Sequence, residues 1–557
     1  MGAARTWTFV ALTLASGEVA RAQAASTSGV TVTSVPAGLV VLGTPTSEFE
    51  ILPSGHVRAF LLKDGRRLTL DDPPEASRVS RDPSVGKRGR DIAVGWSPPK
   101  VSDVVSALGR GKRVELQART PAGLDETLGV EVSEDFPGLA VRTLAFKNTT
   151  AVPIRLDAIV TEQHRLSATL ASPGQLPYSL WSFQGASAEW GTDEILPLSK
   201  NLFRENRMGE PQRNGTGGGI PVVAFWSASV GEALGHLETT PRVLSLPVRV
   251  EGDGHVTASL VLDPKLTLPP GASYVAPRSF VAVFSGDFYE PLRLYSRALQ
   301  REGWTLPLPT EESFAASWCG WGYEANFTLD QMLGIIPKLE ELGLRRATLD
   351  YRWFGSYGDW EPRSDTLPGD AIRRMVGEYH RHGIRVQLWW LPLAAQLATS
   401  PYPSSSAKVG VAKEHPEWLI LDAKGRPARM VFSVAPKEPL ALLCPAVPAV
   451  QEHYKRIAER FIGDWGFDGH KLDYSYTVPP CHNPGHHHAS PEDSIRAMGA
   501  VYKAIFDATR AIKPDAVTQI CPCGTPPNLA WLSYMDQAVT ADPVGSVQVR
   551  RRIKMYK

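Results

Sequence analysis

The first half of this sequence contains no cysteine. All five cysteines among the 557 residues occur late in the chain: Cys319, Cys444, Cys481, Cys521 and Cys523. An odd number at wide spacing excludes the dense disulfide framework of small secreted domains. Cys521 and Cys523 are separated by a single residue, so the redox motif C-x-x-C is absent as well.

The chain also lacks an excess of charge of either sign. It has 59 basic and 58 acidic residues, a formal net charge of +1. A nucleic-acid or anionic-membrane partner usually demands a basic surface, so we expect neither. Gly217–Gly219 has no Lys and no strand-loop-helix context, and no G-x-G-x-x-G follows a predicted strand. We therefore expect no nucleotide cofactor, and no cofactor of any kind.

Long apolar runs are missing too, apart from a short one at the N-terminus. Arg5 precedes the apolar run Trp7 to Ala15, and Ala20-Arg21-Ala22 or Ala22-Gln23-Ala24 offers a cleavage site. This run is too short to span a bilayer. The pattern predicts a signal peptide over residues 1–24 and hence a secreted or periplasmic protein.

Residues 30–286 are expected to form a β domain. Ile154 and Leu156 alternate with polar residues, and so do Val256 and Leu260; Gly, Pro and Asp separate such runs throughout. Period-2 alternation between turn signals predicts antiparallel sheets packed as a sandwich. We find no catalytic constellation in this half.

Residues 287–308 are expected to be a helical linker, because Asp287 precedes a periodic apolar face at Leu292, Tyr295 and Leu299. In residues 309–557 short apolar strands alternate with helices, the first of which opens with the capping box Thr328-x-x-Gln331. Such alternation predicts a parallel sheet. Six strand ends are predicted near Trp318, Asp350, Trp389, Asp473, Cys521 and Asp542.

Irregular loops rich in glycine, proline and aromatic residues follow these strand ends. This asymmetry favours a (β/α)8 TIM-type barrel with its site at the carboxyl ends of the strands, over a doubly wound sheet. Six strands do not close a barrel, and the basic run Val547 to Lys557 would be the sixth helix. Our hypothesis is a barrel that stops after about six βα units, in an incomplete chain or one that a partner, such as a second copy in a homo-oligomer, completes.

Two aspartates at these strand ends are candidates for catalysis. Asp473 follows the fourth strand and Asp542 the sixth, so both belong to the same edge. Retaining glycosidases need two carboxylates about 5–5.5 Å apart, one as nucleophile and one as acid/base. Lys471 shares a strand face with Asp473 and would keep it ionised. The alternative is that Asp473 is a helix cap or a structural ion-pair partner of Lys471.

Several motifs resemble the melibiase-type α-galactosidases of glycoside hydrolase family 36. Lys471-Leu472-Asp473 resembles their Lys-x-Asp nucleophile motif. The others, in chain order, are Phe136-Pro137-Gly138, Phe146-Lys147-Asn148, Leu349-Asp350 with Trp353-Phe354, Gly358-Asp359-Trp360, Leu388-Trp389, Cys521 with Gly524, and Thr540-Ala541-Asp542.

The resemblance implies an N-terminal β-supersandwich over residues 30–286 and a catalytic barrel over 309–557. It implies Asp473 as nucleophile and Asp542 as acid/base, acting on an oligosaccharide or α-galactoside without a metal. The residues expected to line the sugar subsite are Asp350, Trp353, Trp389, Lys471, Cys521 and Trp318.

Three departures from the family pattern bear on specificity. Tyr351 stands where the family has a second aspartate that holds galactose hydroxyls, and Arg352 stands where it has a glycine. Leu391-Pro392-Leu393 replaces an acidic Glu-Pro-Glu. The loop after Asp473 holds Cys481, His482 and His486–His488, whose spacing is not that of a zinc finger. Hydrogen bonds at the pocket rim, a zinc ion, or a disulfide from Cys481 to Cys521 or Cys523 are the alternatives, and we expect no metal.

The leading hypothesis is thus an exported retaining α-glycosidase, most simply an α-galactosidase. A second keeps the mechanism with another sugar, or with transglycosylation. A third, motivated by Tyr351 and the missing strands, is a carbohydrate-binding protein with a degenerate site.

Overall fold

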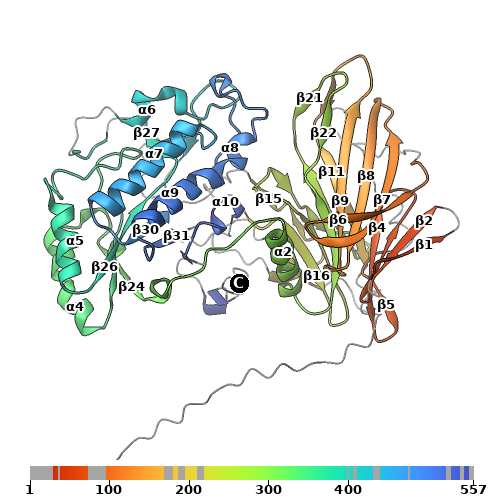
Figure 1. The fold of residues 1–557 in the computed structure, drawn as a ribbon, viewed down its shortest axis with the longest axis horizontal. Coiled ribbons are helices and arrows are strands. Elements are labelled where there is room, and N and C mark those ends of the chain that lie inside the picture. The colour runs from red at the N-terminus through yellow and green to blue at the C-terminus, as the bar shows by residue number, and fades with distance from the viewer. Residues whose placement is uncertain are drawn as a thin grey trace, which may run out of the picture.

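A β-rich half and an α/β half, joined through a single helix, make up the molecule (Figure 1). The computed structural model describes residues 29–35, 38–72, 96–167, 180–185, 195–209, 219–397, 400–404, 410–430, 440–473, 477–521, 528–539, 545–547, 549–550 and 553. No helix in these ranges is long and apolar enough to cross a membrane.

All strand pairs of the first half are antiparallel, as its alternating pattern predicts. They form sheets of five, ten, six and two strands. The five-stranded sheet contains β1 (Thr31–Val35), β2 (Leu39–Gly43), β3 (Ser47–Ile51), β4 (Val57–Lys63) and β5 (Arg66–Leu68). The ten-stranded sheet contains β6 (Lys100–Ser106), β7 (Gly109–Arg119), β8 (Leu124–Ser133), β9 (Leu139–Asn148), β12 (Trp181–Gln184), β13 (Ile195–Pro197), β16 (Val222–Trp226), β17 (Gly231–His236), β22 (Ser273–Val275) and β23 (Ser279–Phe284).

The two smaller sheets complete this half. One contains β11 (Ile159–Ser167), β14 (Phe203–Arg204), β15 (Arg207–Met208), β18 (Leu244–Ser245), β19 (Val248–Val250) and β20 (His255–Leu262), and the other pairs β10 (Ile154–Leu156) with β21 (Leu266–Leu268). Alternate residues of the long strands face the core between the sheets; Leu128, Val130 and Val132 of β8 are fully buried there. This burial is what fixes the register of the strands.

Helix α2 (Tyr289–Arg301) is the predicted linker helix. The carboxylate of Asp287 accepts a hydrogen bond from the backbone N–H of Tyr289, and Leu292, Tyr295 and Leu299 are buried on one face. The ring of Tyr295 stacks on Phe280 of β23 with 5.9 Å between centroids. The helix is therefore held against the β half by the apolar face that the sequence predicts.

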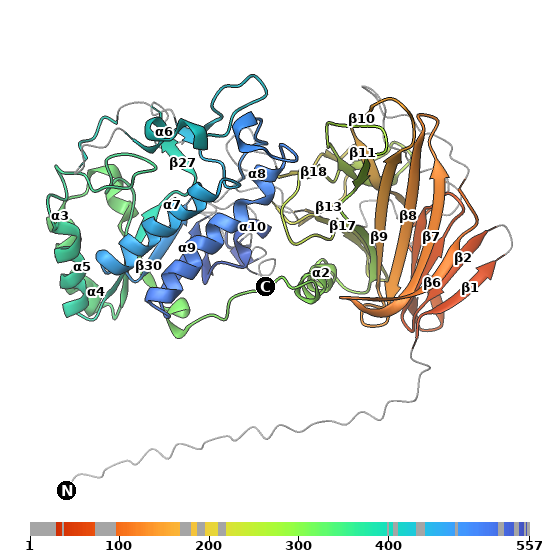
Figure 2. The same ribbon diagram turned by 45° about the horizontal axis from the view of Figure 1, so that its top comes forward.

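Six parallel strands form one sheet in the second half, as predicted, but the sixth ends at Ala538, four residues before the predicted strand end near Asp542. Its order is β24 (Ser317–Cys319), β25 (Arg346–Leu349), β26 (Arg385–Trp390), β30 (Gly469–Asp473), β31 (Val517–Cys521) and β32 (Gln537–Ala538). The helices of this half are η3 (Glu311–Phe314), η4 (Gly320–Asn326), α3 (Leu329–Gly334), α4 (Ile336–Glu341), α5 (Ala371–Arg381), α6 (Val411–Glu414), η5 (Pro416–Trp418), α7 (Pro448–Glu459), η6 (Arg460–Asp464), η7 (Pro484–His486), α8 (Asp493–Arg496), α9 (Met498–Ile512) and α10 (Leu529–Leu532). Figure 2 shows α7 and α9 side by side against the sheet.

Two further details differ from the sequence prediction. The capping box of Thr328 and Gln331 is formed, but the single helix expected after it is two helices that meet at Ile335. Pro337 cannot donate a backbone hydrogen bond, which accounts for the break. A small antiparallel sheet of β27 (Ala394–Gln396), β28 (Arg429–Met430) and β29 (Leu440–Leu442) also follows β26, where we expected only loop.

One face of the parallel sheet is polar and carries the candidate site. Hydrogen bonds connect Gln387 of β26 to Thr348 and Gln519, and Gln519 to Gln537. Side chains alternate along a strand, so Lys471 and Asp473 of β30 share this face while Leu472 lies on the other. The described part of residues 545–557 is too short to test the predicted sixth helix.

Candidate active site

Asp473 ends strand β30 at the carboxyl edge of the sheet. Its side chain is 8% exposed, and the indole N–H of Trp389, on the neighbouring strand β26, donates to Oδ2 at 2.9 Å. A charged acceptor and a buried donor make a strong hydrogen bond. The carboxylate is thus held in one orientation at the edge where βα-barrel enzymes place their catalytic groups.

Asp350, directly after β25, is the centre of a second cluster. Its Oδ2 accepts from the ammonium of Lys471 at 2.7 Å and from the thiol of Cys319 at 3.1 Å, and its Oδ1 accepts from the backbone N–H of Tyr351 at 2.8 Å. Asp350 is 4% exposed. Three donors from three segments therefore position one buried carboxylate.

Lys471 links the two aspartates electrostatically. Burial by itself lowers the pKa of its ammonium, but Asp350 above all, and Asp473 with the neighbouring cysteines, raise it well above the usual value. Its ammonium donates to Asp350 and, at 3.6 Å, to the sulfur of Cys319, rather than to Asp473 as the sequence suggested. The site thus has a permanent cation among acceptor groups, an arrangement that suits ligands with many hydroxyls.

Cys521 ends β31 and is the register partner of Asp473. The residue is buried, with 4% of its surface exposed. The structure therefore brings together five predicted site residues: Asp350, Trp389, Lys471, Asp473 and Cys521.

The two departures from the family motif form an aromatic cluster next to this site. The Tyr351 ring lies 5.3 Å from Trp389, edge to face, and its hydroxyl is 3.2 Å from that of Tyr357. Arg352 adopts a left-handed backbone conformation with φ of 71°, as a glycine would do without strain. Its guanidinium is buried over the rings of Tyr351, Tyr357 and Tyr402, at 5.4, 5.2 and 4.1 Å.

Two predicted sugar-contacting tryptophans are placed elsewhere. Trp353 is fully buried, donates its indole N–H to the carbonyl of Trp389 at 2.7 Å and packs on Phe461 and Trp465, so it supports Trp389 and does not line a cavity. Trp318 packs edge to face on Tyr323 at 6.0 Å. Side chains alternate along the strand, so Cys319 faces the site and its neighbour Trp318 faces the other way.

Cys319 is a site residue that sequence reasoning missed. Side chains alternate along a strand, and Cys319 is the last residue of β24 before Gly320. That position at the strand end was the signal in the sequence. Asp542, the predicted acid/base, lies outside the described residues, so its distance from Asp473 stays a prediction.

Cys481, in the loop that follows Asp473, does not form a disulfide. Cys481 is a free thiol, so the alternative in which it bridges Cys521 is not realised; Cys523 lies outside the described residues. The thiol of Cys481 contacts His486 instead, with 3.3 Å between Sγ and Nδ1.

Comparison with known proteins assigns this half to a family. Residues 314–557 match the family model described as melibiase. These residues form a melibiase domain. A curated protein of Flavonifractor plautii, described as "A type blood alpha-D-galactosamine galactosaminidase", is 33% identical over 392 residues. That match covers 68% of this chain and 35% of the relative, so the chain spans about a third of the relative's length.

Solved structures show that the fold extends beyond the melibiase domain into the β half. The α-galactosidase AgaA of Geobacillus stearothermophilus, of glycoside hydrolase family 36, superposes with a TM-score of 0.59 at 15% identity, covering 93% of this chain and 77% of that one. An α-galactosidase of Lactobacillus brevis gives a TM-score of 0.58 at 14% identity, with 94% and 76% covered. The arrangement of a β-rich half and a melibiase domain is therefore a known architecture.

Proposed function

We propose that this protein is a retaining α-glycoside hydrolase that removes a terminal galactose-type sugar. The observation that carries the proposal is Asp473, a buried carboxylate at the carboxyl end of a parallel strand, oriented by Trp389 and accompanied by the Lys471–Asp350 ion pair. Its position in a Lys-x-Asp motif within a melibiase domain supports the same role.

In the proposed double displacement, a carboxylate oxygen of Asp473 attacks the anomeric carbon. Asp542 donates its proton to the glycosidic oxygen as the bond to the leaving group breaks, which gives a glycosyl-aspartate intermediate. Asp542 then takes a proton from water, and the oxygen of that water attacks the anomeric carbon and frees Asp473. The separation of about 5–5.5 Å required for retention is our expectation for the two carboxylates.

The Asp350 cluster is proposed to bind the sugar hydroxyls. Carboxylate oxygens accept hydrogen bonds from hydroxyl groups, whereas the Lys471 ammonium and the Cys319 thiol donate them. Trp389 and Cys521 would form the wall beside Asp473. We further propose that the six-stranded sheet belongs to a (β/α)8 barrel, because its strands are parallel and consecutive, with helices between them.

We also propose that the protein is exported from the cell's cytoplasm. The signal-peptide pattern lies in residues outside the described ranges, and it supports a secreted or periplasmic location. Fractionation of cells that express the full coding sequence tests this: we expect mature protein that begins after residue 22 or 24. Retention in the cytoplasm with Met1 or Gly2 as first residue would contradict it.

A second candidate substrate is an α-D-galactosaminide. The relative at 33% identity is named for galactosamine, whereas the α-galactosidases are similar in fold at 14–15% identity. Tyr351 in place of an aspartate that holds galactose hydroxyls also indicates a pocket different from theirs.

The experiment uses p-nitrophenyl α-glycosides of galactose, galactosamine and N-acetylgalactosamine, with glucose as the non-cognate sugar. We expect turnover of one of the first two, with NMR showing release of the α-anomer first. Asp473→Asn abolishes turnover and Asp542→Asn lowers it by roughly a hundredfold or more. Asp507→Asn, on the exposed face of α9 and paired with Lys503, is the control that leaves turnover unchanged.

Two outcomes would sink the proposal. Release of the β-anomer would show an inverting enzyme. Sugar binding without turnover, unaffected by Asp473→Asn, would favour the carbohydrate-binding alternative. For the nucleophile itself, Asp473→Gly with added azide is expected to form the β-glycosyl azide, since azide enters from the face that the carboxylate vacates.

A further inference from the structure

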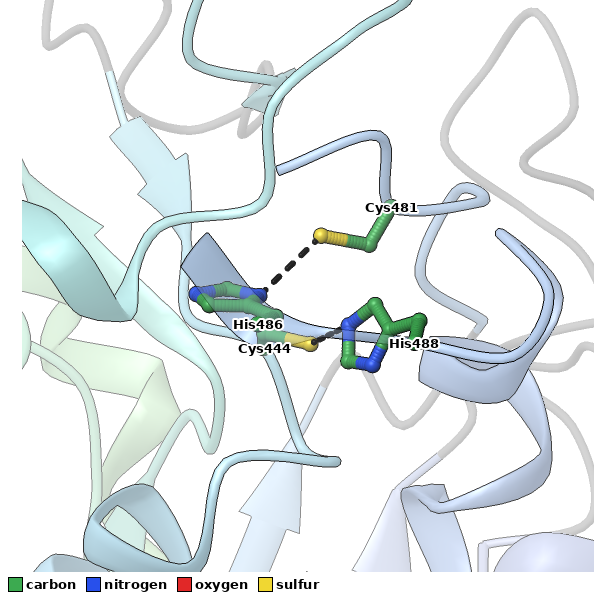
Figure 3. Close-up of side chains that lie close together, drawn as sticks. All are labelled: Cys444, Cys481, His486 and His488. Atoms are coloured by element: carbon green, nitrogen blue, oxygen red, sulfur yellow. Dashed lines mark hydrogen bonds between the residues drawn. The ribbon is translucent and has the colours of Figure 1, made fainter. Parts of the chain in front are cut away.

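Four potential metal ligands converge beside the melibiase domain's small antiparallel sheet (Figure 3). They are Cys444, just after β29, and Cys481, His486 and His488, in the loop that follows the Asp473 strand. One ligand atom of each lies within 4.8 Å of those of all the others. The two thiols are buried and the two imidazoles half-buried.

We propose that these four residues form a structural zinc site. Zn–S bonds near 2.3 Å and Zn–N bonds near 2.0–2.1 Å in a tetrahedron put neighbouring ligand atoms roughly 3.3–3.8 Å apart. Cys481 Sγ is 3.3 Å from His486 Nδ1, and Cys444 Sγ is 3.3 Å from His488 Nε2. These two contacts have the spacing of ligands around a shared ion, and all four atoms lie within 4.8 Å of one another.

The hydrogen bond of His486 supports a ligand role for its other nitrogen. Nε2 is 2.6 Å from the backbone carbonyl oxygen of Glu417, which can only accept, so Nε2 carries the proton. The side-chain nitrogen of Asn483 is farther from it, at 3.1 Å, and donates to the Leu419 carbonyl. In the neutral ring Nδ1 then presents a lone pair, and this atom faces the Cys481 thiol. A carbonyl that fixes the tautomer and orientation in this way is the usual outer partner of a metal-binding histidine.

The local backbone explains how histidines so close in sequence reach one centre. His487 between them is left-handed, with φ of 53°, which turns the chain so that His486 and His488 face each other at 5.1 Å. His482 and His487 are exposed and do not join the cluster. The fourth ligand, Cys444, lies 37 residues before Cys481, which is why the sequence spacing resembles no zinc finger.

Charge and coordination number identify the ion. Two cysteines bind Zn²⁺ as thiolates and release two protons, so the occupied site is neutral, as burial requires. Two thiolates with two imidazoles favour zinc over the hard cations Ca²⁺ and Mg²⁺. Four protein ligands leave no open position for water, so the ion is structural and this proposal does not depend on the glycosidase chemistry.

The bound ion would secure the loop that starts behind Asp473. Hydrogen bonds already join this loop to the segment around η5: His482 N–H donates to Leu421 and the Asn483 amide to Leu419. Cys444 anchors its own segment through its N–H to the Trp418 carbonyl, at 2.8 Å. Zinc would thus cross-link two chain segments that frame the carboxyl edge of β30.

The test is metal analysis of the full chain purified without added chelator. We expect one zinc per chain by ICP mass spectrometry, lost in Cys444→Ser and Cys481→Ser and kept in the matched controls His482→Asn and His487→Asn. Removal of zinc by dipicolinate lowers Tm, and one equivalent of ZnCl2 restores it. Co²⁺ in place of zinc gives the visible bands and thiolate charge-transfer absorption of a tetrahedral S2N2 site.

Thiol titration keeps the proposal testable if the cysteine variants do not fold. After unfolding with chelator and no reductant, all five cysteines of the chain react if Cys444 and Cys481 held zinc. Three reactive thiols, with peptide mapping that joins Cys444 to Cys481, would reveal a disulfide between them and overturn the proposal. Wild-type protein that holds no zinc and acquires no tetrahedral cobalt spectrum would overturn it too.

Discussion

Trp389 and Trp390 are adjacent in sequence but donate their indole N–H groups on opposite faces of β26. Trp389 donates to Asp473, and Trp390 donates to Nδ1 of His470 at 3.2 Å. His470 in turn has its Nε2 2.8 Å from the Thr509 hydroxyl on α9. The first hydrogen bond belongs to the candidate site and the second to the packing of the strand on its helix.

Replacing each of these two tryptophans by phenylalanine tests whether their hydrogen bonds have different roles. Trp389→Phe keeps an aromatic ring but removes a donor to a charged carboxylate, an interaction of about 1.5–3 kcal/mol. We expect kcat/KM to fall roughly ten- to a hundredfold. Trp390→Phe is expected to cost about 1 kcal/mol of stability and to leave kcat unchanged. Equal kinetic effects of both changes would show that Trp389 acts only through packing.

The pairing of strand β30 with β31 depends on a close approach between their backbones at the first residue of β30. Gly469 has φ of 154°, and a Cβ there would lie 2.1 Å from the carbonyl oxygen of Val517 on β31. Only glycine lets the two strands pair in this register, which aligns Asp473 with Cys521. The register of the strand therefore fixes the position of the site's carboxylate.

Gly469→Ala is thus expected to lower the free energy of unfolding by about 2–3 kcal/mol and to reduce kcat, since backbone has to move. Gly377 in the middle of α5 is the control, because its Cβ would meet nothing within 4 Å. Gly377→Ala should stabilise the protein by roughly 0.5–1 kcal/mol through helix propensity. Thermal unfolding and steady-state kinetics measure both; an unchanged Tm for Gly469→Ala would contradict the argument.

The same elements show what the sequence could and could not predict. The alternation of short apolar runs with helices located the six parallel strands, because each crossover between neighbouring parallel strands needs a helix-length connection. It also placed Asp350, Lys471 and Asp473 on one edge. The sequence prediction placed Trp318 at the site wrongly, because in so short a strand it does not show which of two adjacent residues, Trp318 or Cys319, faces the site. It gave no sign of Cys444 beside Cys481, since that approach depends on an inserted sheet with no periodic signature.

Across the whole molecule, one group of buried charges in the β half makes stability depend on pH. Burial raises the pKa of Glu232 to about 7, and the charge of Asp71 adds to this against the opposing effect of His164. His164 Nδ1 is 3.0 Å from Glu232 and 3.1 Å from Asp71, and Glu162 and Arg142 pack on the same cluster. Glu232 is therefore protonated in the native state at mildly acidic pH.

The raised pKa of Glu232 determines whether stability rises or falls with pH. A carboxyl whose pKa is raised on folding, here from 4.5 to about 7, stabilises fully below pH 4.5, and this contribution is lost as pH rises to about 7. Glu232→Gln mimics the protonated form, so above pH 7 the variant should be more stable than the wild type by roughly 2–4 kcal/mol. Tm measured from pH 4.5 to 8 tests this; the exposed Glu205→Gln is the control. Parallel curves for wild type and Glu232→Gln would refute the assignment.

The two halves are joined at the loop that carries the proposed zinc ligands. Glu492 binds Arg242 of the β half with two hydrogen bonds of 3.0 and 2.9 Å and accepts the Val243 N–H at 2.6 Å. Thr477, at the other end of the loop, is 3.5 Å from the Gly209 carbonyl. The β half thereby holds a loop that begins directly after the Asp473 strand.

We expect this contact to couple the β half to the site. In a double-mutant cycle, Arg242→Met and Glu492→Gln should show an interaction energy of about 1–2 kcal/mol, because the pair is bidentate but not fully buried. Either change should also speed amide exchange in residues 477–492, while Glu459→Gln, at the solvent-accessible end of α7 where it pairs with Lys455, should not. Additive effects with unchanged exchange would mean that the loop is ordered by the melibiase domain alone, and the β half would then contribute only to stability.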